Sequence, residues 1–184
     1  GWIAPVSLLA SITETGAIQP VAEIAAQVHA AGTLLHVDAV QGFLRIPFMI
    51  NELNADLVTI SGHKIGGPKG VGALIARSTA AMPHALIAGG GQERGRRAGT
   101  ENVPGIAGFG AAVAAAMAAA PIEIPHMLRL RRLLEDGLKA SRDAVIFAEG
   151  AERLPNTTLV GAHGMRAETA VIGFDLAGVA ARLE

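Results

Sequence analysis

Short, uninterrupted apolar runs that alternate with helical spacing constrain the fold of this sequence most. Four such runs occupy residues 3–10, 33–37, 57–60 and 71–76. Between the first two runs, residues 20–31 place apolar side chains on one face of a helix and stop at Gly32. Strands that are apolar along their whole length are typical of sheets covered by helices. The pattern therefore predicts an α/β fold with a mainly parallel sheet covered by helices.

The second half of the sequence predicts a smaller unit. Residues 103–120 form an alanine-rich helical pattern, and residues 127–142 form an amphipathic one with leucines on one face. Strands are expected at residues 144–148 and 157–160, and a helix at residues 167–176. Pro121 and Pro125 separate the two long helical patterns. We therefore expect residues 1–122 to be part of a large domain and residues 123–184 to be part of a smaller C-terminal α+β domain.

Composition excludes several classes of function. The 184 residues carry a net charge of −1, only 3% aromatic residues and no tyrosine, so nucleic acid is not an expected partner. The longest apolar stretch, residues 106–124, is mostly alanine and glycine and contains Pro121, so we expect no membrane span. The absence of cysteine fits a reducing, cytoplasmic compartment and excludes thiolate chemistry within these residues. The chain begins without methionine inside an apolar run and has no leader pattern, so we expect a partial chain.

Polar residues follow two of the expected strands. One strand leads into His36-Val37-Asp38-Ala39-Val40-Gln41, and the next leads into the segment from Ser61 to Gly70 with Lys64 inside it. The carboxyl ends of parallel strands form the ligand edge of open α/β sheets. A pyridoxal phosphate (PLP) site needs a lysine that forms an imine with the cofactor aldehyde and an acid that keeps the ring nitrogen protonated. Glycines beside the lysine would let the backbone approach a planar ring.

Each of these residues also has a structural interpretation. An aspartate at a strand end commonly caps a turn, and a single lysine is commonly solvated. His36 and Asp38 share one face of a strand and could imitate a metal pair, but no third ligand stands near, so we expect no metal. The glycines around Lys64 lack the Gly-Lys-Ser/Thr order of a phosphate loop. On spacing alone, a PLP site remains one interpretation among these.

The amino-acid sequences of three blocks show a family resemblance. They are His36 to Gln41, then Ser61-Gly62-His63-Lys64-Ile65-Gly66-Gly67-Pro68-Lys69-Gly70, then Gly89-Gly90-Gly91-Gln92-Glu93-Arg94-Gly95-Arg96-Arg97-Ala98-Gly99-Thr100-Glu101-Asn102. In order and spacing they resemble the cysteine desulfurases, which are class V aminotransferase-like PLP enzymes. Residues 14–20 and 154–157 match flanking patterns of that family. The resemblance implies the type I fold of PLP-dependent transferases, with part of its smaller C-terminal domain.

The resemblance also implies a role for each site residue. Lys64 would bind PLP covalently and move protons, and His36 is the second candidate catalytic residue. Asp38 would pair with the ring nitrogen and Gln41 with the ring hydroxyl. The cofactor phosphate would be bound by Ser61 and His63, and by Thr100 acting on the partner subunit of a homodimer. Arg94, Arg96 and Arg97 suit anion contacts, subunit pairing or a solvated face.

One departure and several absences qualify the resemblance. The family places two asparagines before Glu14, whereas this sequence has Ile12-Thr13, so Thr13 offers a hydroxyl to the cofactor in place of an amide. The ring-stacking histidine, the sulfur-accepting cysteine loop and the arginine for the substrate carboxylate are expected outside these residues. The implied reaction converts L-cysteine to L-alanine and passes sulfur, as an enzyme persulfide, to an acceptor or scaffold protein, for example in iron–sulfur cluster assembly. We expect this chain alone to be inactive.

Three other interpretations remain open. The chain could belong to a selenocysteine lyase or another class V PLP lyase, from which the missing C-terminal loop would distinguish it. It could be a truncated, non-catalytic module that binds partners, although intact Asp38, Gln41, His63 and Lys64 speak against decay. A phosphate-binding α/β protein that uses residues 94–100 would leave Asp38 and Lys64 unexplained.

Overall fold

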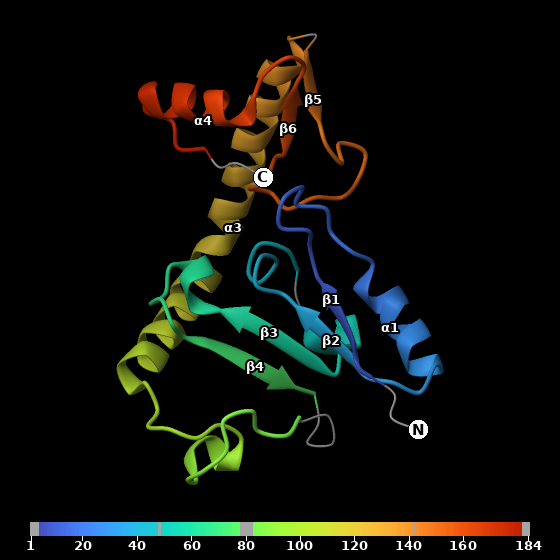
Figure 1. The fold of residues 1–184 in the computed structure, drawn as a ribbon, viewed down its shortest axis with the longest axis vertical. Helices are drawn as coiled ribbons and strands as arrows, with labels where there is room; N and C mark the ends of the chain where they lie inside the picture. Colours follow the sequence, from blue (N-terminus) through green and yellow to red (C-terminus); the bar gives the residue numbers. More distant parts are fainter. Residues whose placement is uncertain (1–3, 48, 78–82, 142, 182–184) are drawn as a thin grey trace.

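The computed structural model describes residues 4–47, 49–77, 83–141 and 143–181, and its larger body is built on a four-stranded sheet (Figure 1). The strands are β1 (Val6–Leu9), β2 (Leu35–Asp38), β3 (Leu57–Ser61) and β4 (Gly72–Ala76), in the order β1-β2-β3-β4. The first three are parallel, and β4 runs antiparallel to β3. The predicted mainly parallel sheet is therefore confirmed, with one antiparallel edge strand.

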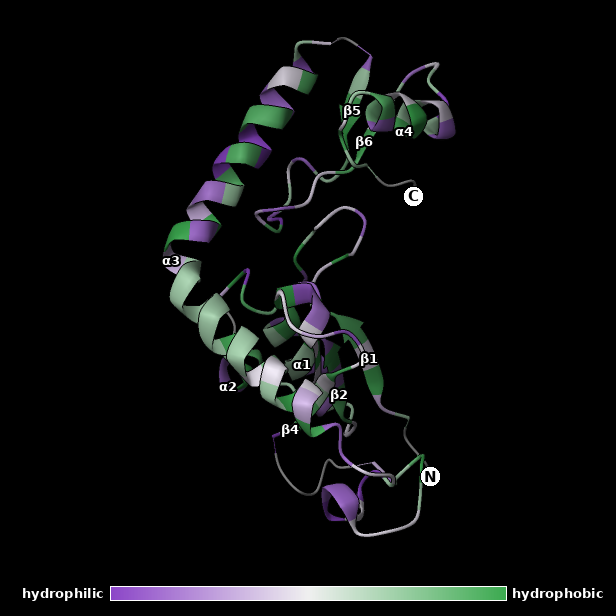
Figure 2. Cartoon of the chain, turned by 90° about the vertical axis from the view of Figure 1, so that its left-hand side faces the viewer, coloured by the Kyte–Doolittle hydropathy of each residue, from purple (hydrophilic) through white to green (hydrophobic). Residues whose placement is uncertain are grey.

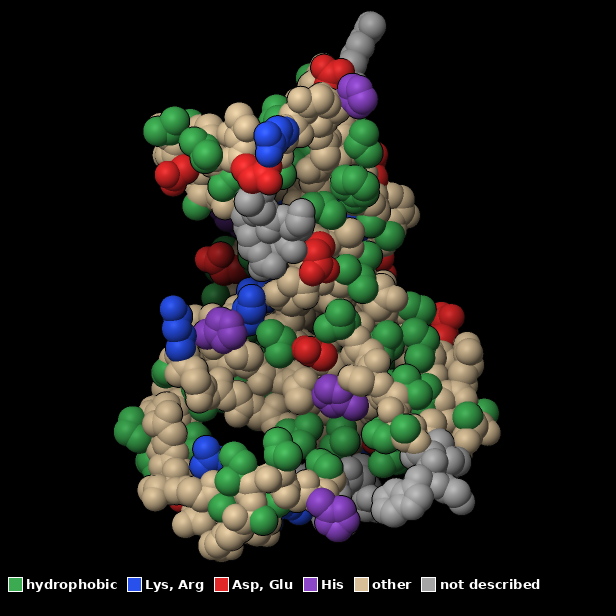
Figure 3. All heavy atoms as spheres, in the orientation of Figure 1, with side chains coloured by type: hydrophobic (Ala, Val, Ile, Leu, Met, Phe, Trp, Pro, Cys, Tyr) green, Lys and Arg blue, Asp and Glu red, His purple; other side chains and the backbone are tan. Residues whose placement is uncertain are grey.

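One face of the sheet packs on the hydrophobic core. Helix α1 (Val21–Ala30) connects β1 to β2, and its buried side chains Val21, Ala25 and Val28 meet the inward side chains of the central strands. The inward residues of β2 and β3 are fully or almost fully buried: Leu35, Val37, Val58 and Ile60. The alternate residues of β2 and β3 face the other way and include partly exposed polar side chains, such as His36 and Asp38. The larger body thus leaves a partly polar sheet face accessible among the described residues, and Figure 3 shows histidines among hydrophobic side chains on one surface of this body.

Three short helical turns lie in the described part of the larger body. They are α2 (Ile50–Leu53), η1 (Gly62–Ile65) and η3 (Gln92–Gly95). None was expected from the sequence, because a single turn is too short to show helical periodicity. The turn η1 follows β3 directly, so it positions the residues around Lys64 at the end of a buried strand.

A single helix, α3 (Val103–Lys139), spans 37 residues and connects the two bodies of the molecule (Figure 1). It begins at Asn102, whose side-chain oxygen accepts a hydrogen bond from the Gly105 amide. The prediction of two helices separated at Pro121 and Pro125 is therefore wrong. Both prolines lie four residues apart on an exposed part of one helix, and strong helix formers flank them on both sides. The two lost amide donors fall on one solvent-exposed side, so the helix continues through them.

Helix α3 is also the one helix among the described residues that is long and apolar enough to cross a membrane, by length and composition alone. A single helix of this kind is weak evidence for a membrane span. Phe109 of this helix is buried in the core of the larger body, and Glu135 near its other end is buried in a polar network. Both ends of the helix therefore contact other parts of the protein.

The smaller body contains the second half of α3 and three further elements. Strands β5 (Ala144–Ile146) and β6 (Val160–Ala162) pair antiparallel, and α4 (Ala167–Leu176) follows. The strand expected at residues 157–160 begins only at Val160, because residues 153–158 run along α3 instead. Figure 2 shows hydrophobic residues along α3 and α4, and Leu133, Leu134 and Leu176 are among those that stay exposed.

Candidate functional site

The carboxyl ends of β2 and β3 lie at the same edge of the sheet. Asp38, the last residue of β2, is in register with Thr59 of β3, and β3 ends two residues later at Ser61. The two strands are rich in apolar residues and are buried, so packing in the core fixes the positions of their ends. The two polar segments predicted to form a site, residues 36–41 and 61–70, therefore begin on adjacent strands.

Asp38 is half-buried and holds the turn that follows β2. Its Oδ1 accepts a hydrogen bond from the Val40 amide at 2.9 Å, and its carbonyl accepts one from the Ala10 amide at 2.8 Å. Asp38 therefore caps a turn, and it does so through one of its two carboxylate oxygens. Capping fixes the carboxylate at the edge of the sheet, which is the arrangement that a partner for a ring nitrogen requires.

His36 lies on the same sheet face as Asp38 and bridges the strands on either side. Its Nδ1 lies 2.8 Å from Ser7 Oγ on β1, and its Nε2 lies 3.2 Å from Thr59 Oγ1 on β3. Both ring nitrogens are thereby within hydrogen-bond distance of protein hydroxyls. His36, two residues before Asp38, therefore connects β2 with both neighbouring strands, β1 and β3.

The turn η1 presents the lysine loop. Lys64 is half-buried, and Ser61 Oγ lies 2.8 Å from His63 Nδ1, so the hydroxyl and the imidazole are adjacent. The glycines beside Lys64 serve packing against α3. A Cβ on Gly62 would lie 3.1 Å from the Phe109 ring, and one on Gly67 would lie 3.2 Å from the Ala112 Cβ, both on α3. These glycines therefore let the lysine loop approach α3 closely.

Arg45 lies beside the candidate site, although no pattern in the sequence indicates it. It is half-buried, and its guanidinium donates hydrogen bonds to the carbonyl oxygens of Gln41 at 2.8 Å and Lys64 at 2.6 Å. Burial lowers the pKa of the Arg45 guanidinium. No motif marked this arginine, because its partners are backbone atoms that only the folded chain brings near. It connects the turn that carries Gln41 with the turn that carries Lys64.

Thr13 lies in a turn at the end of β1 that contacts the smaller body. In this turn Gly16 accepts a hydrogen bond from the Leu154 amide at 2.8 Å, and Ile18 donates one to the Glu152 carbonyl at 2.9 Å. A Cβ on Gly16 would lie 2.8 Å from the Thr157 Cβ, so the approach requires glycine. The patterns at residues 14–20 and 154–157, recognised separately in the sequence, thus contact each other.

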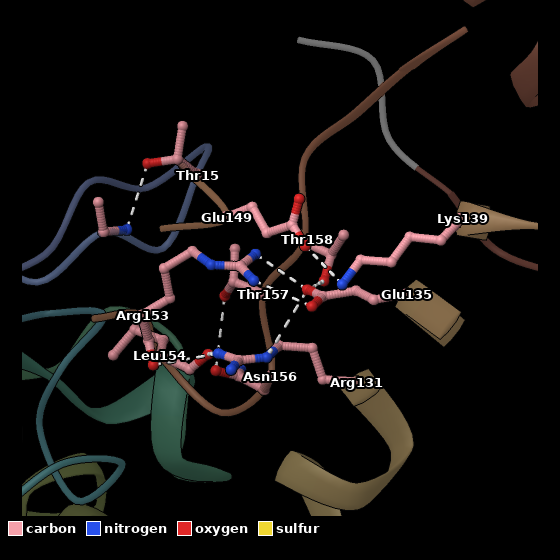
Figure 4. Close-up of polar contacts among 11 residues, drawn as sticks. Thr15, Arg131, Glu135, Lys139, Glu149, Arg153, Leu154, Asn156, Thr157 and Thr158 are labelled. Atoms are coloured by element: carbon pink, nitrogen blue, oxygen red, sulfur yellow. Dashed lines mark hydrogen bonds and ion pairs between the residues drawn. The ribbon is translucent and has the colours of Figure 1, made fainter. Parts of the chain in front are cut away.

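The contact continues into a buried polar network at the second half of α3 (Figure 4). Arg153 binds Glu135 of α3, and Thr158 donates a hydrogen bond to the same carboxylate at 2.7 Å. Arg131 donates to the carbonyl oxygens of Arg153 and Leu154. The network holds residues 153–158 in place beside the turn that carries Thr13.

Thr100 lies apart from the other candidate residues. It is exposed in the segment between η3 and α3, which lies beyond β4 and away from η1 in Figure 1. Glu93 and Arg94 in the same segment adopt left-handed backbone conformations, and Arg94, Arg96 and Arg97 are exposed. The structure therefore brings Asp38, Gln41 and Lys64 to one edge and leaves Thr100 outside it.

The donor set at this edge fits the chemistry of PLP. Lys64 supplies an amine, Asp38 a fixed carboxylate, Gln41 an amide, and Ser61 with His63 an adjacent hydroxyl and imidazole. A cofactor with an aldehyde, a basic ring nitrogen and a phosphate needs these groups. Among the described residues, no cluster of three or more His, Cys, Asp or Glu side chains has the arrangement of a metal site.

Comparison with known proteins shows the family of this chain. The family model described as "Aminotransferase class-V" matches residues 3–183, and the chain belongs to this family, whose members depend on PLP. A "Cysteine desulfurase" of Trichormus azollae is 41% identical over 182 residues, which is 98% of this chain and 45% of that protein. A "Cysteine desulfurase" of Gluconacetobacter diazotrophicus is 42% identical over 97% of this chain and 46% of its own length.

A solved structure gives the same relationship. The NifS-like protein from Rickettsia africae superposes with a TM-score of 0.90 at 40% identity, covering 98% of this chain and 50% of its own. The expected type I fold and the resemblance to cysteine desulfurases are confirmed. The chain spans about half the length of the curated relatives it matches.

Proposed function

We propose that these residues form the lysine-bearing part of a PLP-dependent cysteine desulfurase. The reaction would convert L-cysteine to L-alanine and pass the sulfur on as an enzyme-bound persulfide. The observation that carries the proposal is the meeting of Asp38, Gln41 and Lys64 at one edge of the parallel strands. Similarity to proteins named cysteine desulfurase over 98% of the chain supports this reaction over others of the family.

Each side chain would have a defined task. PLP, when bound, supplies an electron sink for cleavage of bonds beside an amino group. Lys64 would hold the cofactor and move a proton at its Nζ, while Asp38 would keep the ring nitrogen protonated. Gln41 would hydrogen-bond the ring hydroxyl, Ser61 and His63 would bind the phosphate, and Thr13 would add a hydroxyl contact. The two hydrogen-bonded ring nitrogens of His36 support a role in fixing Asp38, and its catalytic role stays a prediction.

Assembly is part of the proposal. The exposed position of Thr100, apart from η1, suits a phosphate contact made to a second copy in a homodimer. We place the domain boundary at residue 122, within α3, so that residues 1–122 belong to the large domain and 123–184 to the small one. A cytoplasmic location and a sulfur-accepting scaffold protein complete the proposal. The apolar α3 would be a protein-packing helix and not a membrane span.

The sulfur-accepting thiol has to lie outside residues 1–184, because these contain no cysteine. We therefore expect the 184-residue chain alone to form no alanine from L-cysteine. The test mixes this chain and the protein that carries it with PLP and L-cysteine and measures alanine and sulfide. Lys64-dependent alanine from the 184-residue chain would contradict the need for an external thiol. A protein that binds PLP on Lys64 but releases only selenium from L-selenocysteine would replace the desulfurase proposal with the lyase.

A further inference from the structure

One guanidinium connects the two turns that carry the proposed cofactor residues. Arg45 donates through Nη1 to the carbonyl of Gln41, four residues earlier, at 2.8 Å. It donates through Nη2 to the carbonyl of Lys64, nineteen residues later, at 2.6 Å. The first bond lies within the turn after β2, and the second reaches the turn after β3. The side chain is therefore a bridge between neighbouring strand ends.

The backbone before Arg45 is held in an uncommon conformation. Leu44 has a φ of 59°, in the left-handed region that a branched, bulky residue rarely adopts. The amides of Arg45 and Ile46 both donate to the Gly42 carbonyl, at 3.0 and 3.2 Å, which closes the turn around Leu44. Such conformations persist where the surroundings fix them. The turn therefore fixes the backbone of Arg45, and from this position its side chain reaches both carbonyl oxygens.

The chemistry of the bridge requires arginine. A guanidinium is planar and presents its donors in a rigid fork, so two acceptors at different places can be bound at once. A lysine ammonium is a compact point charge that would bind one carbonyl well and leave the other without this donor. Burial of the guanidinium lowers its pKa and costs hydration, and the two carbonyl bonds offset this cost. The two hydrogen bonds therefore define the distance between the carbonyl groups of Gln41 and Lys64.

We infer that Arg45 is a positioning residue that fixes the turn of Gln41 relative to the turn of Lys64. This inference rests on the proposed function, because its purpose is to hold the PLP contacts of both turns in place before the cofactor arrives. Preorganised ligand groups bind more tightly than groups that must be ordered on binding. Arg45 acts through backbone atoms, and no contact with the cofactor is required of it.

The first test needs no cofactor. It measures amide hydrogen exchange of the protein that carries these residues, as wild type, Arg45→Lys and Arg45→Met. The matched control is Arg132→Lys, at an exposed position on α3. We expect exchange at residues 39–46 and 62–67 to be about tenfold faster in both Arg45 variants, with β2 and β3 unchanged. Exchange equal to the control in a folded Arg45→Lys protein would overturn the bridge, whether or not Arg45→Met folds.

The second test measures cofactor uptake by the same variants. We expect Arg45→Lys to bind PLP about tenfold more weakly than wild type, with an altered pH midpoint of the bound cofactor's visible band. Wild-type affinity and midpoint in Arg45→Lys would overturn the positioning role. A wild-type protein that takes up no PLP on Lys64 would overturn the proposed function instead, and faster exchange in Arg45→Lys would still support the bridge.

Discussion

Glu135 and Arg153 form a two-pronged ion pair that is almost fully buried. Arg153 Nη2 donates to Glu135 Oε2 at 2.9 Å, and its Nη1 lies 2.9 Å from Oε1 (Figure 4). The two residues are 6% and 8% exposed. The pair connects the second half of α3 with the segment that contacts the Thr13 turn. It is one of several polar links between the helix and this loop, together with the hydrogen bonds of Arg131 and Thr158.

Removing one partner of this pair should destabilise the protein strongly. Glu135→Ala leaves the Arg153 guanidinium buried without its carboxylate, and such losses cost about 3–5 kcal/mol. The free energy of unfolding in urea measures the effect. Asp136→Asn, an exposed neighbour on the same helix, is the control and should change stability by less than about 0.5 kcal/mol. Equal losses in the two variants would show that the ion pair has no special role.

Acid should weaken the folded state through the same carboxylate. Burial raises the pKa of Glu135, but hydrogen bonds from Arg153 and Thr158 and the charges of Arg153 and Arg131 outweigh burial, so the folded pKa is lowered. The stabilisation is complete above the ordinary glutamate pKa of 4.5 and is lost as pH falls from there through the folded pKa. Glu135→Gln should therefore lose less stability than wild type between neutral and acid pH. Parallel pH profiles would contradict this assignment.

Asp56 should make a second, separate contribution to the free energy of unfolding, and this contribution should also be lost in acid. Burial raises its pKa, but the Leu35 amide, at 2.8 Å, and His29, also at 2.8 Å, lower it more. Asp56→Ala leaves the buried amide at the start of β2 without this acceptor and should cost about 1–3 kcal/mol. The comparison is Glu52→Gln on the exposed side of α2. Urea unfolding that is unchanged in Asp56→Ala would rule out the contribution.

The edge of the sheet should be sensitive to a single methyl group at Gly72. A Cβ there would lie 2.5 Å from the Ile60 carbonyl oxygen of the neighbouring strand, so Gly72→Ala must displace β4 from β3. We expect a loss of about 1–3 kcal/mol in thermal or urea unfolding. Gly137→Ala on α3, where no atom lies within 4 Å of the added Cβ, should be neutral or stabilise by about 0.5–1 kcal/mol. Identical stability of the two variants would contradict the packing at Gly72.

The strands, and the position of the candidate site residues at the strand ends, could be predicted because their signals are local. The apolar runs that end at Asp38 and Ser61 mark both a buried strand and its carboxyl end, and these ends meet at one edge of a parallel sheet. The lysine loop was found for the same reason. The sequence indicates that its glycines serve the cofactor, whereas Gly62 and Gly67 also allow close packing on α3, a segment distant in sequence.

The features that the sequence did not predict depend on contacts between distant segments. Arg45 binds carbonyl oxygens, which have no residue identity, and Glu135 meets Arg153 only after α3 and the following loop fold together. The sequence does not indicate the continuity of α3, because Pro121 and Pro125 predict a helix end, although the flanking helix formers outweigh them. Local rules describe the intrinsic cost of such residues and not what the surrounding structure tolerates.

The most direct test of Lys64 as the lysine that holds PLP is the location of a reduced adduct. The protein that carries these residues is mixed with PLP, its visible absorption is recorded, and borohydride reduction is followed by peptide mass analysis. Lys64→Ala is the loss variant, and exposed Lys69 and Lys139 are internal controls. We expect a visible band and one pyridoxyl adduct on Lys64, both lost in Lys64→Ala. An adduct spread over Lys69 and Lys139, or a band that persists in folded Lys64→Ala, would contradict this role of Lys64.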